Sequence, residues 1–297
     1  MNQSFGREKI LYLINPISGT RNKEHLPGLI KELTDEKFFD AEVLITKYKG
    51  EATEMVRQKL IENYRYFVAV GGDGTVNEVA KVLINTKAIM GIIPVGSGNG
   101  LARHLKIPLH PRKAIQIINR LKYQAIDYGL INNLPFFCTC GVGFDALIGE
   151  KFGQSKGRGL TNYVKTTIKE YFKYEPEMYQ ITIDNERMSN HRAFLITFAN
   201  ASQYGNDAYI APKANICDGK LDICVLSPFS IFDAPGIGFR LFSKNIHKSS
   251  HMYTDRASTI VLERESEGVI HFDGEPCTMG KKIEISLINK GLNVIVP

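Results

Sequence analysis

Apolar and polar positions follow different rhythms in the two halves of the chain. Up to about residue 120, short apolar runs alternate with segments whose apolar residues recur at helical spacing. The predicted strands are Lys9–Asn15, Ala41–Thr46, Tyr66–Val70 and Ile89–Pro94, and the predicted helices are Glu24–Leu33, Glu51–Asn63 and Val76–Ile84, with a further helix after the fourth strand. This alternation predicts a doubly wound, mostly parallel α/β sheet with helices on both faces.

Beyond about Gln124 the chain consists mainly of short strands separated by turn residues. The predicted strands are Phe136–Gly141, Met178–Asp184, Ala193–Asn200, Leu221–Leu226, Ser258–Glu263, Val269–Phe272 and Ile283–Leu287, and helical spacing persists only in Leu160–Phe172 and Ile231–Phe242. Such a series predicts a mostly antiparallel β-sandwich. We therefore expect two domains, residues 1–125 and 126–289, and the strand-like run Asn293–Pro297 is compatible with a return of residues 290–297 to the first domain.

The composition is that of an ordinary globular protein, with 43% hydrophobic and 23% charged residues. No apolar run reaches the roughly 18 residues that a membrane-spanning helix needs. The first ten residues lack the apolar core of a secretory signal peptide. The five cysteines show no metal-binding spacing, which indicates reduced, buried thiols. Together these features predict a cytoplasmic protein.

The net charge of +6 is unevenly distributed. Residues 151–173 carry Lys151, Lys156, Arg158, Lys165, Lys169 and Lys173, and residues 240–248 carry Arg240, Lys244, His247 and Lys248. Basic clusters of this kind attract phosphates, anionic lipid headgroups or nucleic acid, but an ordinary solvated helix face has the same composition. Charge by itself therefore does not decide the partner.

The run Gly71-Gly72-Asp73-Gly74-Thr75 lies between the third predicted strand and a helix. Glycines let the backbone bend sharply and approach a ligand closely, and the amides at the start of a helix attract phosphate. Asp73 can hold the loop or bind magnesium through water, and Thr75 and Asn77 can donate hydrogen bonds to phosphate oxygens. The alternative is a hairpin turn, which Asp-Gly favours, but the residues that follow have helical periodicity and not that of a strand.

Two more glycine-containing loops follow predicted strands: Asn15–Thr20 (NPISGT) after the first and Pro94–Asn99 (PVGSGN) after the fourth. Loops at the carboxyl ends of parallel strands meet at one crevice, where open α/β sheets bind their ligands. The sequence therefore predicts one phosphate-binding edge built from three loops. Neither G-x-x-x-x-G-K-[ST] nor G-x-G-x-x-G is present, which argues against a P-loop ATPase and an ordinary dehydrogenase.

Candidate carboxylates for acid–base or metal chemistry lie in the second half of the chain. Asp273 and Glu275 belong to a DGE turn between two strand patterns, Asp127 lies in AIDYG, and Asp218 lies in NICDGKLDI. A carboxylate can serve as the base of a phosphoryl transfer or help to bind a hard cation. A plain hairpin turn at Asp273 and an Asx turn at Asp218 are also compatible with the residues. The seven histidines show no ligand spacing.

On these segments the chain resembles the diacylglycerol kinase catalytic family, which includes bacterial lipid kinases and the sphingosine and ceramide kinases. The resemblance extends nearly from end to end. It rests on NPISG, Thr46 with KGEA, GGDGTVNEV, PVGSGNGLARHL, AIDYG, NASQYGNDAYIAPKANICDGKLDI and FDGE. The resemblance implies a two-domain enzyme that binds ATP on the α/β domain and a lipid in the cleft between the domains.

The resemblance also implies roles for individual residues. The residues expected to contact ATP are Asn15, Pro16, Ser18, Gly19, Thr46, Gly71, Gly72, Asp73, Gly74, Thr75, Asn77 and Ser97. Asp73 and Asp127 are expected to join an aspartate–water–magnesium network. Asp218, with the carbonyl groups of Asn215 and Lys220, is expected to hold a structural magnesium ion. Either Asp273 or Glu275 is expected to deprotonate the lipid hydroxyl, and the resemblance does not separate the two.

One position departs from the bacterial pattern. Bacterial diacylglycerol kinases commonly have Asn-Asp after the third glycine loop, whereas this chain has Asn99-Gly100, which is similar to sphingosine kinases. The change removes one anionic group from the expected metal network and puts a hydrogen-bonded turn at risk. Because every other matched carboxylate is present, we expect activity to be retained, on a diacylglycerol-like or a sphingoid-type lipid.

The expected activity is transfer of the γ-phosphate of ATP, with Mg²⁺, to a primary hydroxyl of a lipid. The expected partners are ATP and a lipid substrate at the membrane surface, with no nucleic acid; family members often form homodimers, so a homodimer is a further expectation. The basic segments would hold the protein peripherally at an anionic membrane.

The sequence is also compatible with two alternatives to a lipid kinase. An NAD kinase shares a GGDG loop and a similar two-domain plan, but PVGSGNGLARHL and the metal-site segment fit it less well. A non-catalytic nucleotide- or lipid-binding protein of the same fold is supported only by Gly100.

Overall fold

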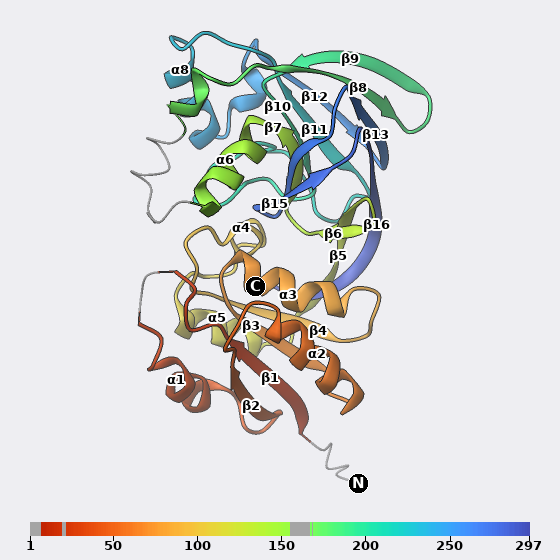
Figure 1. Cartoon of the computed structure of the whole chain (residues 1–297). Helices are drawn as coiled ribbons and strands as arrows, with labels where there is room; N and C mark the ends of the chain where they lie inside the picture. Colours follow the sequence, from red (N-terminus) through yellow and green to blue (C-terminus); the bar gives the residue numbers. More distant parts are fainter. Residues whose placement is uncertain (1–6, 20–21, 155–166, 168) are drawn as a thin grey trace. The chain divides into compact units, whose positions relative to one another are not determined.

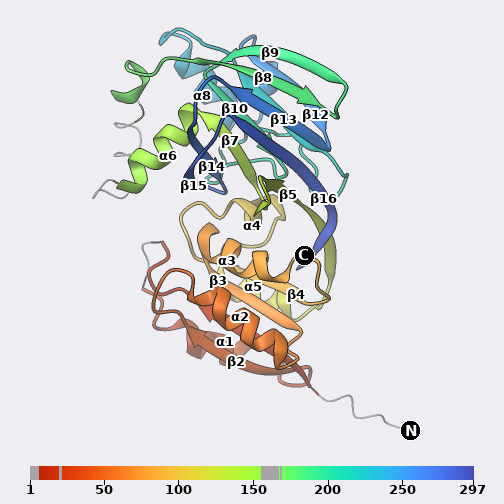
Figure 2. The same cartoon turned by 45° about the vertical axis from the view of Figure 1, so that its right-hand side comes forward.

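The structure is a computed structural model that describes residues 7–19, 22–154, 167 and 169–297. The chain divides into two compact units. Unit 1 contains Met1–Ile126 and Lys290–Pro297, and unit 2 contains Asp127–Asn289. Unit 1 is a layered α/β structure, and unit 2 consists mainly of strands (Figures 1 and 2).

A mostly parallel sheet forms the centre of unit 1. Its strands are β1 (Glu8–Ile14), β2 (Phe39–Ile45), β3 (Tyr66–Gly71) and β4 (Ile89–Pro94), in the order β2-β1-β3-β4 with every neighbouring pair parallel. β3 and β4 are buried along their whole length, as expected of strands that are covered on both faces. The end of β16 (Lys282–Ile295) adds a further parallel strand, because Asn293 and Val294 pair with Ile89 and Met90 of β4.

Helices cover both faces of this sheet (Figure 2). They are α1 (Leu26–Leu33), α2 (Glu51–Ile61), α3 (Asp73–Leu83), α4 (Gly100–His104) and α5 (Pro111–Ile118). Right-handed crossovers in this strand order place α1 on one face and α2 and α3 on the other. In agreement, α2 contacts α3, and α1 contacts α5. Val79 of α3 and Ile115 of α5 are fully buried, so the apolar side of each helix is its packed side.

Two antiparallel sheets form unit 2. The first has the order β12-β11-β10-β7-β14-β15, with bounds β7 (Thr139–Gly143), β10 (Leu195–Ala199), β11 (Leu221–Leu226), β12 (Met252–Ala257), β14 (Gly268–Phe272) and β15 (Glu275–Met279). The second joins the first part of β16 to β13 (Thr259–Arg264), β8 (Glu177–Ile183) and β9 (Arg187–Ala193). Ile196 of the first sheet and Leu262 of the second share one buried apolar cluster, so the sheets pack face to face as a β-sandwich.

Shorter elements complete the two units. They are β5 (Tyr123–Ile131), β6 (Leu134–Phe136), α6 (Phe144–Gln154), α8 (Ala234–Phe242) and a single 3-10 turn at Ile246–Lys248. β5 and β16 each contain residues of both units. Of the helices within the described residues, none is long and apolar enough to cross a membrane.

The predicted fold class is confirmed: an α/β unit with a mostly parallel sheet, followed by an antiparallel β-sandwich. Some boundaries were predicted wrongly. α3 begins at Asp73 and not at Val76, so Gly74 and Thr75 belong to the helix. α8 begins at Ala234 and not at Ile231, since the proline at position 235 suits the first turn of a helix. Of the predicted helix Leu160–Phe172, residues 160–166 and 168 lie outside the described residues, as do Lys156, Arg158 and Lys165.

Candidate active site

The predicted phosphate-binding loops follow strands of the unit 1 sheet. β1 leads into Asn15–Gly19, β3 into Gly72, and β4 into residues 95–99. β1 and β3 are neighbours, and the chain leaves them toward opposite sides of the sheet, to β2 and to β4. This is a topological switch point, where open α/β sheets bind ligands beyond the carboxyl ends of their strands.

The loop after β1 is held against the start of α3. Asn15 Nδ2 donates to Thr75 Oγ1 over 3.1 Å, and Ser18 Oγ lies 3.5 Å from the same Thr75 oxygen. Gly19 has a φ of +61°, and a Cβ atom there would lie 2.4 Å from the carbonyl oxygen of Val95. Both the left-handed backbone and this contact require glycine, so the loops after β1 and β4 pack directly on each other.

Glycines also bring the loops after β3 and β4 into backbone contact. A Cβ atom on Gly96 would lie 2.3 Å from Cα of Gly72, and one on Gly71 would lie 2.3 Å from Thr75 Oγ1. Gly74 is exposed in the first turn of α3, where a helix leaves N–H groups without intrahelical partners. The three loops therefore form one compact edge that presents a helix start suited to an anion.

Asp73 joins the β3 loop to the start of α4. Its Oδ2 accepts the N–H of Asn99 over 2.8 Å, and its Oδ1 accepts that of Gly100 over 2.7 Å. Burial raises the pKa of the Asp73 carboxyl above its usual value, while the two amides and the charge of Arg103 act in the opposite direction. Gly98 leaves room for this carboxylate, because a Cβ atom there would lie 2.5 Å from Asp73 Oδ2.

The turn at Asn99-Gly100 is intact although position 100 carries no carboxylate. Asn99 has a φ of +54°, and its side chain closes the loop: Oδ1 accepts the Gly96 N–H over 3.1 Å, and Nδ2 donates to the Gly96 carbonyl over 2.8 Å. With the Gly100 N–H bound to Asp73, the hydrogen-bonded turn that the sequence put at risk is present. The departure at Gly100 is therefore confined to one missing negative charge.

The other residues expected to contact ATP differ in exposure. Thr46 follows β2 and is buried, with its N–H and its hydroxyl 2.9 and 3.4 Å from the Ile14 carbonyl oxygen. Asn77 is half-buried on α3, whereas Pro16 and Ser97 are exposed. Thr46 thus holds the end of β1 in place, and Ser97 presents its hydroxyl to solvent.

Two cations at this edge were missed by the sequence patterns. Lys23 is 8% exposed, its Nζ donates to the Pro16 carbonyl over 3.4 Å, and burial lowers the pKa of its ammonium group. Arg103 of α4 donates its Nε to the Gly98 carbonyl over 3.1 Å. Phosphate sites commonly combine backbone amides with such cations. Arg103 lies inside PVGSGNGLARHL and was recoverable from it, but Lys23 lies outside every motif.

In unit 2, Asp273 is fixed in a tight hairpin turn. Asp273 and Gly274 link β14 to β15 with φ of +49° and +81°, as in the type I′ turns that Asp-Gly favours. The Asp273 carboxylate accepts three backbone N–H groups, those of Phe137 at 2.8 Å, Cys138 at 2.7 Å and Thr139 at 3.2 Å. Its oxygens thus hold residues 137–139 against the hairpin turn.

Glu275 occupies a different environment in the same hairpin. It is the first residue of β15, is half-buried, and pairs with Phe272 across the turn. The hairpin turn that was one reading of Asp273-Gly274 is therefore correct, and Glu275 is the second carboxylate that this turn carries.

Asp127 is fully buried in β5 and organises the segment Asn215–Lys220. Its N–H donates to the Ile216 carbonyl over 2.8 Å, and its Oδ2 accepts the Gly219 N–H over 2.8 Å. Asn200 Nδ2 donates to the Asp127 carbonyl over 2.9 Å. Asp127 thereby fixes the segment that was expected to bind a structural magnesium ion.

Within that segment, Asp218 is paired with an arginine. Its Oδ2 accepts from the Arg256 guanidinium, and its Oδ1 accepts the Lys220 N–H over 3.1 Å. Asn215 Oδ1 accepts the Cys217 N–H over 3.1 Å. Across the part of the chain that is described, no three His, Cys, Asp or Glu side chains form a group that could hold a metal ion. The magnesium site expected from Asp218 with the carbonyl groups of Asn215 and Lys220 contains only one such side chain, so it stays a prediction.

A buried polar cluster beside the β14–β15 hairpin was also missed. His271 of β14 is 4% exposed, and its Nε2 lies 3.0 Å from Asp145 Oδ2. The Tyr204 hydroxyl donates to the same oxygen over 3.0 Å and lies 2.5 Å from Thr197 Oγ1, and burial raises the pKa of Tyr204. Asp145 and His271 are 126 positions apart, so no local pattern could reveal the pair.

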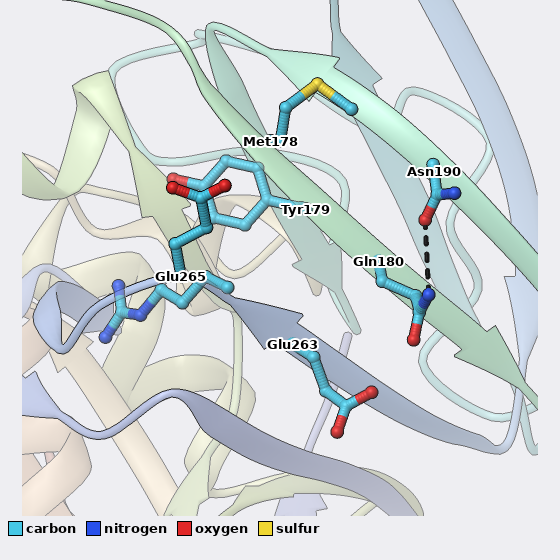
Figure 3. Close-up of a pocket in the computed structure, with 7 residues that line it drawn as sticks. Met178, Tyr179, Gln180, Asn190, Glu263 and Glu265 are labelled. Atoms are coloured by element: carbon cyan, nitrogen blue, oxygen red, sulfur yellow. Dashed lines mark hydrogen bonds between the residues drawn. The ribbon is translucent and has the colours of Figure 1, made fainter.

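A hollow on unit 2 contains none of the predicted site residues (Figure 3). It encloses ≈ 250 Å³ and is lined by Met178, Tyr179, Gln180, Asn190, Glu263, Arg264 and Glu265. Arg264 directs its guanidinium to backbone carbonyls, including those of Gly268 at 2.8 Å and Met279 at 2.7 Å. The carboxylates of Glu263 and Glu265 line this hollow, and the guanidinium of Arg264 is bound to backbone carbonyl groups. The hollow therefore does not suit a phosphate group.

Two family models match the chain. The model described as the diacylglycerol kinase catalytic domain matches residues 9–131. The model described as the YegS C-terminal NAD kinase beta sandwich-like domain matches residues 138–295. The first match contains the three glycine loops, and the second contains Asp218, Asp273 and Glu275.

Several curated proteins are similar over almost the whole chain. An uncharacterised protein of Synechocystis is 32% identical, covering 98% of this chain and 71% of its own length. A diacylglycerol kinase of Mycobacterium tuberculosis is 27% identical, covering 97% of this chain and 95% of its own. A probable YegS-like lipid kinase of Enterobacter is also 27% identical, over 98% of this chain and 96% of its own.

Among solved structures, a diacylglycerol kinase from Bacillus anthracis superposes with a TM-score of 0.75. The match covers 98% of this chain and 97% of that chain at 23% identity, and so supports the fold alone. The two family models together cover most of the chain, and their matches include the three glycine loops and the hairpin turn. The protein therefore belongs to the diacylglycerol kinase family of lipid kinases.

Proposed function

We propose that the protein transfers the γ-phosphate of magnesium-bound ATP to a hydroxyl group of a lipid. The observation that carries this proposal is the edge formed by the loops after β1, β3 and β4, which Asp73, Thr75 and the glycine contacts hold together. An edge that combines a helix start with nearby cations suits the triphosphate of a nucleotide. Membership of a kinase family supports phosphoryl transfer as the reaction.

In this proposal unit 1 binds the nucleotide. Ser97 and the amides at the start of α3 contact phosphate oxygens, and Lys23 and Arg103 supply positive charge. Asn15, Ser18, Gly19, Thr46 and Thr75 keep the loops in position. Asp73 fixes the β4 loop through two amides, and its negative charge would help to hold the magnesium ion that arrives with ATP.

Unit 2 supplies the base. The Glu275 carboxylate takes the proton of the lipid hydroxyl, the oxygen of that hydroxyl bonds to the γ-phosphorus, and the bond to the bridging oxygen breaks to release ADP. Glu275 is favoured over Asp273 because the Asp273 oxygens already accept three backbone N–H groups. Asp127 contributes by fixing the segment around Gly219.

The acceptor is a lipid with a primary hydroxyl, either diacylglycerol-like or sphingoid-type. The test is to incubate the protein with labelled ATP, magnesium and micelles of diacylglycerol, monoacylglycerol, sphingosine or ceramide, with NAD in a parallel reaction. We expect at least one lipid and not NAD to be labelled. Labelling of NAD would instead identify an NAD kinase, and ATP binding without a labelled lipid would identify a non-catalytic relative.

Asp73→Asn is the matched variant for this test. An asparagine keeps one acceptor oxygen for the amides of Asn99 and Gly100 but loses the negative charge. Turnover is expected to fall at least about 100-fold, while the far-ultraviolet circular dichroism spectrum stays that of the wild type. Full turnover in a folded Asp73→Asn protein would refute the assignment.

A further inference from the structure

Helix α8 turns an apolar face toward solvent. Its Ile237 and Leu241, one turn apart, pack against a buried cluster of unit 2. Phe239 and Phe242 lie on the opposite side of the helix and are 74% and 58% exposed. None of the nine residues of α8 is buried. The helix is therefore apolar on both sides, and the unit covers only one of them.

The residues around this face leave it open. Ile231 and Phe232, just before the helix, are 37% and 90% exposed. Cβ atoms built on Gly236 and Gly238 would meet no atom within 4 Å. Exposed aromatic side chains that gather on one short segment mark interaction sites more often than single exposed residues do.

The charged residues of this segment favour an anionic partner. Residues 231–248 carry Arg240, Lys244 and Lys248 and one acidic residue, Asp233, whose Oδ2 lies 3.7 Å from His251 Nε2. Lys244 and Lys248 are exposed, and Lys244 Nζ lies 4.4 Å from the ring centre of Tyr209. Phenylalanines combined with flanking cations are the composition of segments that lie in the interface of an anionic bilayer, where rings enter the acyl boundary and cations contact headgroup phosphates.

At their exposures the three phenylalanines present on the order of 450 Å² of apolar surface. Binding to a bilayer increases with each apolar side chain that enters the interface, so these rings would contribute to attachment together with the neighbouring cations.

We propose that residues 231–248, centred on α8, are the segment that docks this protein on anionic membranes. Phe232, Phe239 and Phe242 enter the interface, and Arg240, Lys244 and Lys248 contact the phosphate groups of the lipids. The inference builds on the proposed lipid kinase function, for which the docked segment brings unit 2 to the membrane that holds the acceptor.

The experiment is sedimentation of the protein with vesicles, without ATP. Vesicles of phosphatidylcholine alone are compared with vesicles that also contain phosphatidylglycerol. Phe232→Ser/Phe239→Ser should weaken binding by about tenfold or more for each ring removed. Arg240→Gln/Lys244→Gln should weaken binding about fivefold for each charge on anionic vesicles and leave binding to neutral vesicles unchanged. Met188→Ser is the control, since this apolar side chain of β9 is 67% exposed and lies outside residues 231–248.

Several outcomes would overturn the inference. Wild-type vesicle binding by the Phe232→Ser/Phe239→Ser protein would do so, as would an equal loss in Met188→Ser. If the phenylalanine variant changed the oligomeric state in light scattering and kept its vesicle binding, the face would be an interface between copies of the chain. Because binding is measured without ATP, an inactive protein that docks through α8 would refute only the proposed function. A protein that phosphorylates a lipid in micelles but does not sediment with vesicles would refute only this inference.

Discussion

At the scale of single residues, the carboxylates of the candidate site differ in what holds them. Asp73 accepts two amides of the β4 loop, and Asp273 accepts three amides of Phe137–Thr139. The three amides stabilise the folded position of Asp273, whereas a base has to approach a substrate proton. Sequence could not separate Asp273 from Glu275, because the amides that distinguish them lie 134 to 136 positions away.

Asp273→Asn and Glu275→Gln are therefore expected to change different quantities, stability and turnover. Asp273→Asn replaces a charged acceptor of three amides, so the free energy of unfolding should fall by about 1.5–3 kcal/mol. Glu275→Gln keeps the shape but removes the proposed base, so turnover should fall by about 10²–10⁴-fold with the free energy of unfolding unchanged. Urea denaturation and initial rates measure the two quantities. Wild-type turnover in Glu275→Gln would mean that the base lies elsewhere.

At the scale of elements, apolar strands were predictable and polar or interrupted ones were not. β4 and β11 begin and end as predicted, at Ile89–Pro94 and Leu221–Leu226. β9 was missed because RMSNHRA is a mostly exposed edge strand without apolar alternation. Phe136–Gly141 was predicted as one strand because it is continuously apolar, but the amides of Phe137 and Cys138 bind Asp273 and leave the ladder.

The same reason limits prediction of the site. The glycine loops were predictable because each motif is local and each follows a strongly apolar strand. The Asp218–Arg256 pair was not predictable, because the two residues lie 38 positions apart and come together only in the folded sheet.

β16 provides a test at this scale, because one strand serves both cores. Ile283 lies in its unit 2 part and Ile295 in its unit 1 part, and both are at most 1% exposed. Ile283→Ala and Ile295→Ala should each lower the free energy of unfolding by about 2–5 kcal/mol. ATP is proposed to bind unit 1, so it should raise the temperature of the calorimetric transition in which unit 1 unfolds. Ile295→Ala should lower the temperature of that transition, and Ile283→Ala should lower that of the transition in which unit 2 unfolds. A single transition that both substitutions shift equally would contradict this expectation.

For the whole molecule, His104 makes stability depend on pH. Burial lowers the pKa of this imidazole from its usual 6.5 to about 4. Between these values the unfolded chain binds a proton that the folded chain excludes, so stability is lost as the pH falls from about 6.5 to 4, by at most about 3 kcal/mol.

His104→Gln should flatten this part of the stability curve. The measurement is the free energy of unfolding in urea at pH 7 and at pH 4.5, and the exposed His25 provides the control substitution His25→Gln. If the wild type and His104→Gln lost the same stability between these pH values, another group would be responsible.

The return of β16 to unit 1 has a consequence for biosynthesis. Translation produces β1 to β4 early, but the strand that pairs with β4 through Asn293 and Val294 emerges only after all of unit 2. Until then the nascent chain carries an open edge at β4, and open strand edges recruit other chains. A ribosome that stalls within unit 2 thus leaves unit 1 without its last strand. Synthesis of unit 1 therefore begins before that of unit 2 and is completed after it.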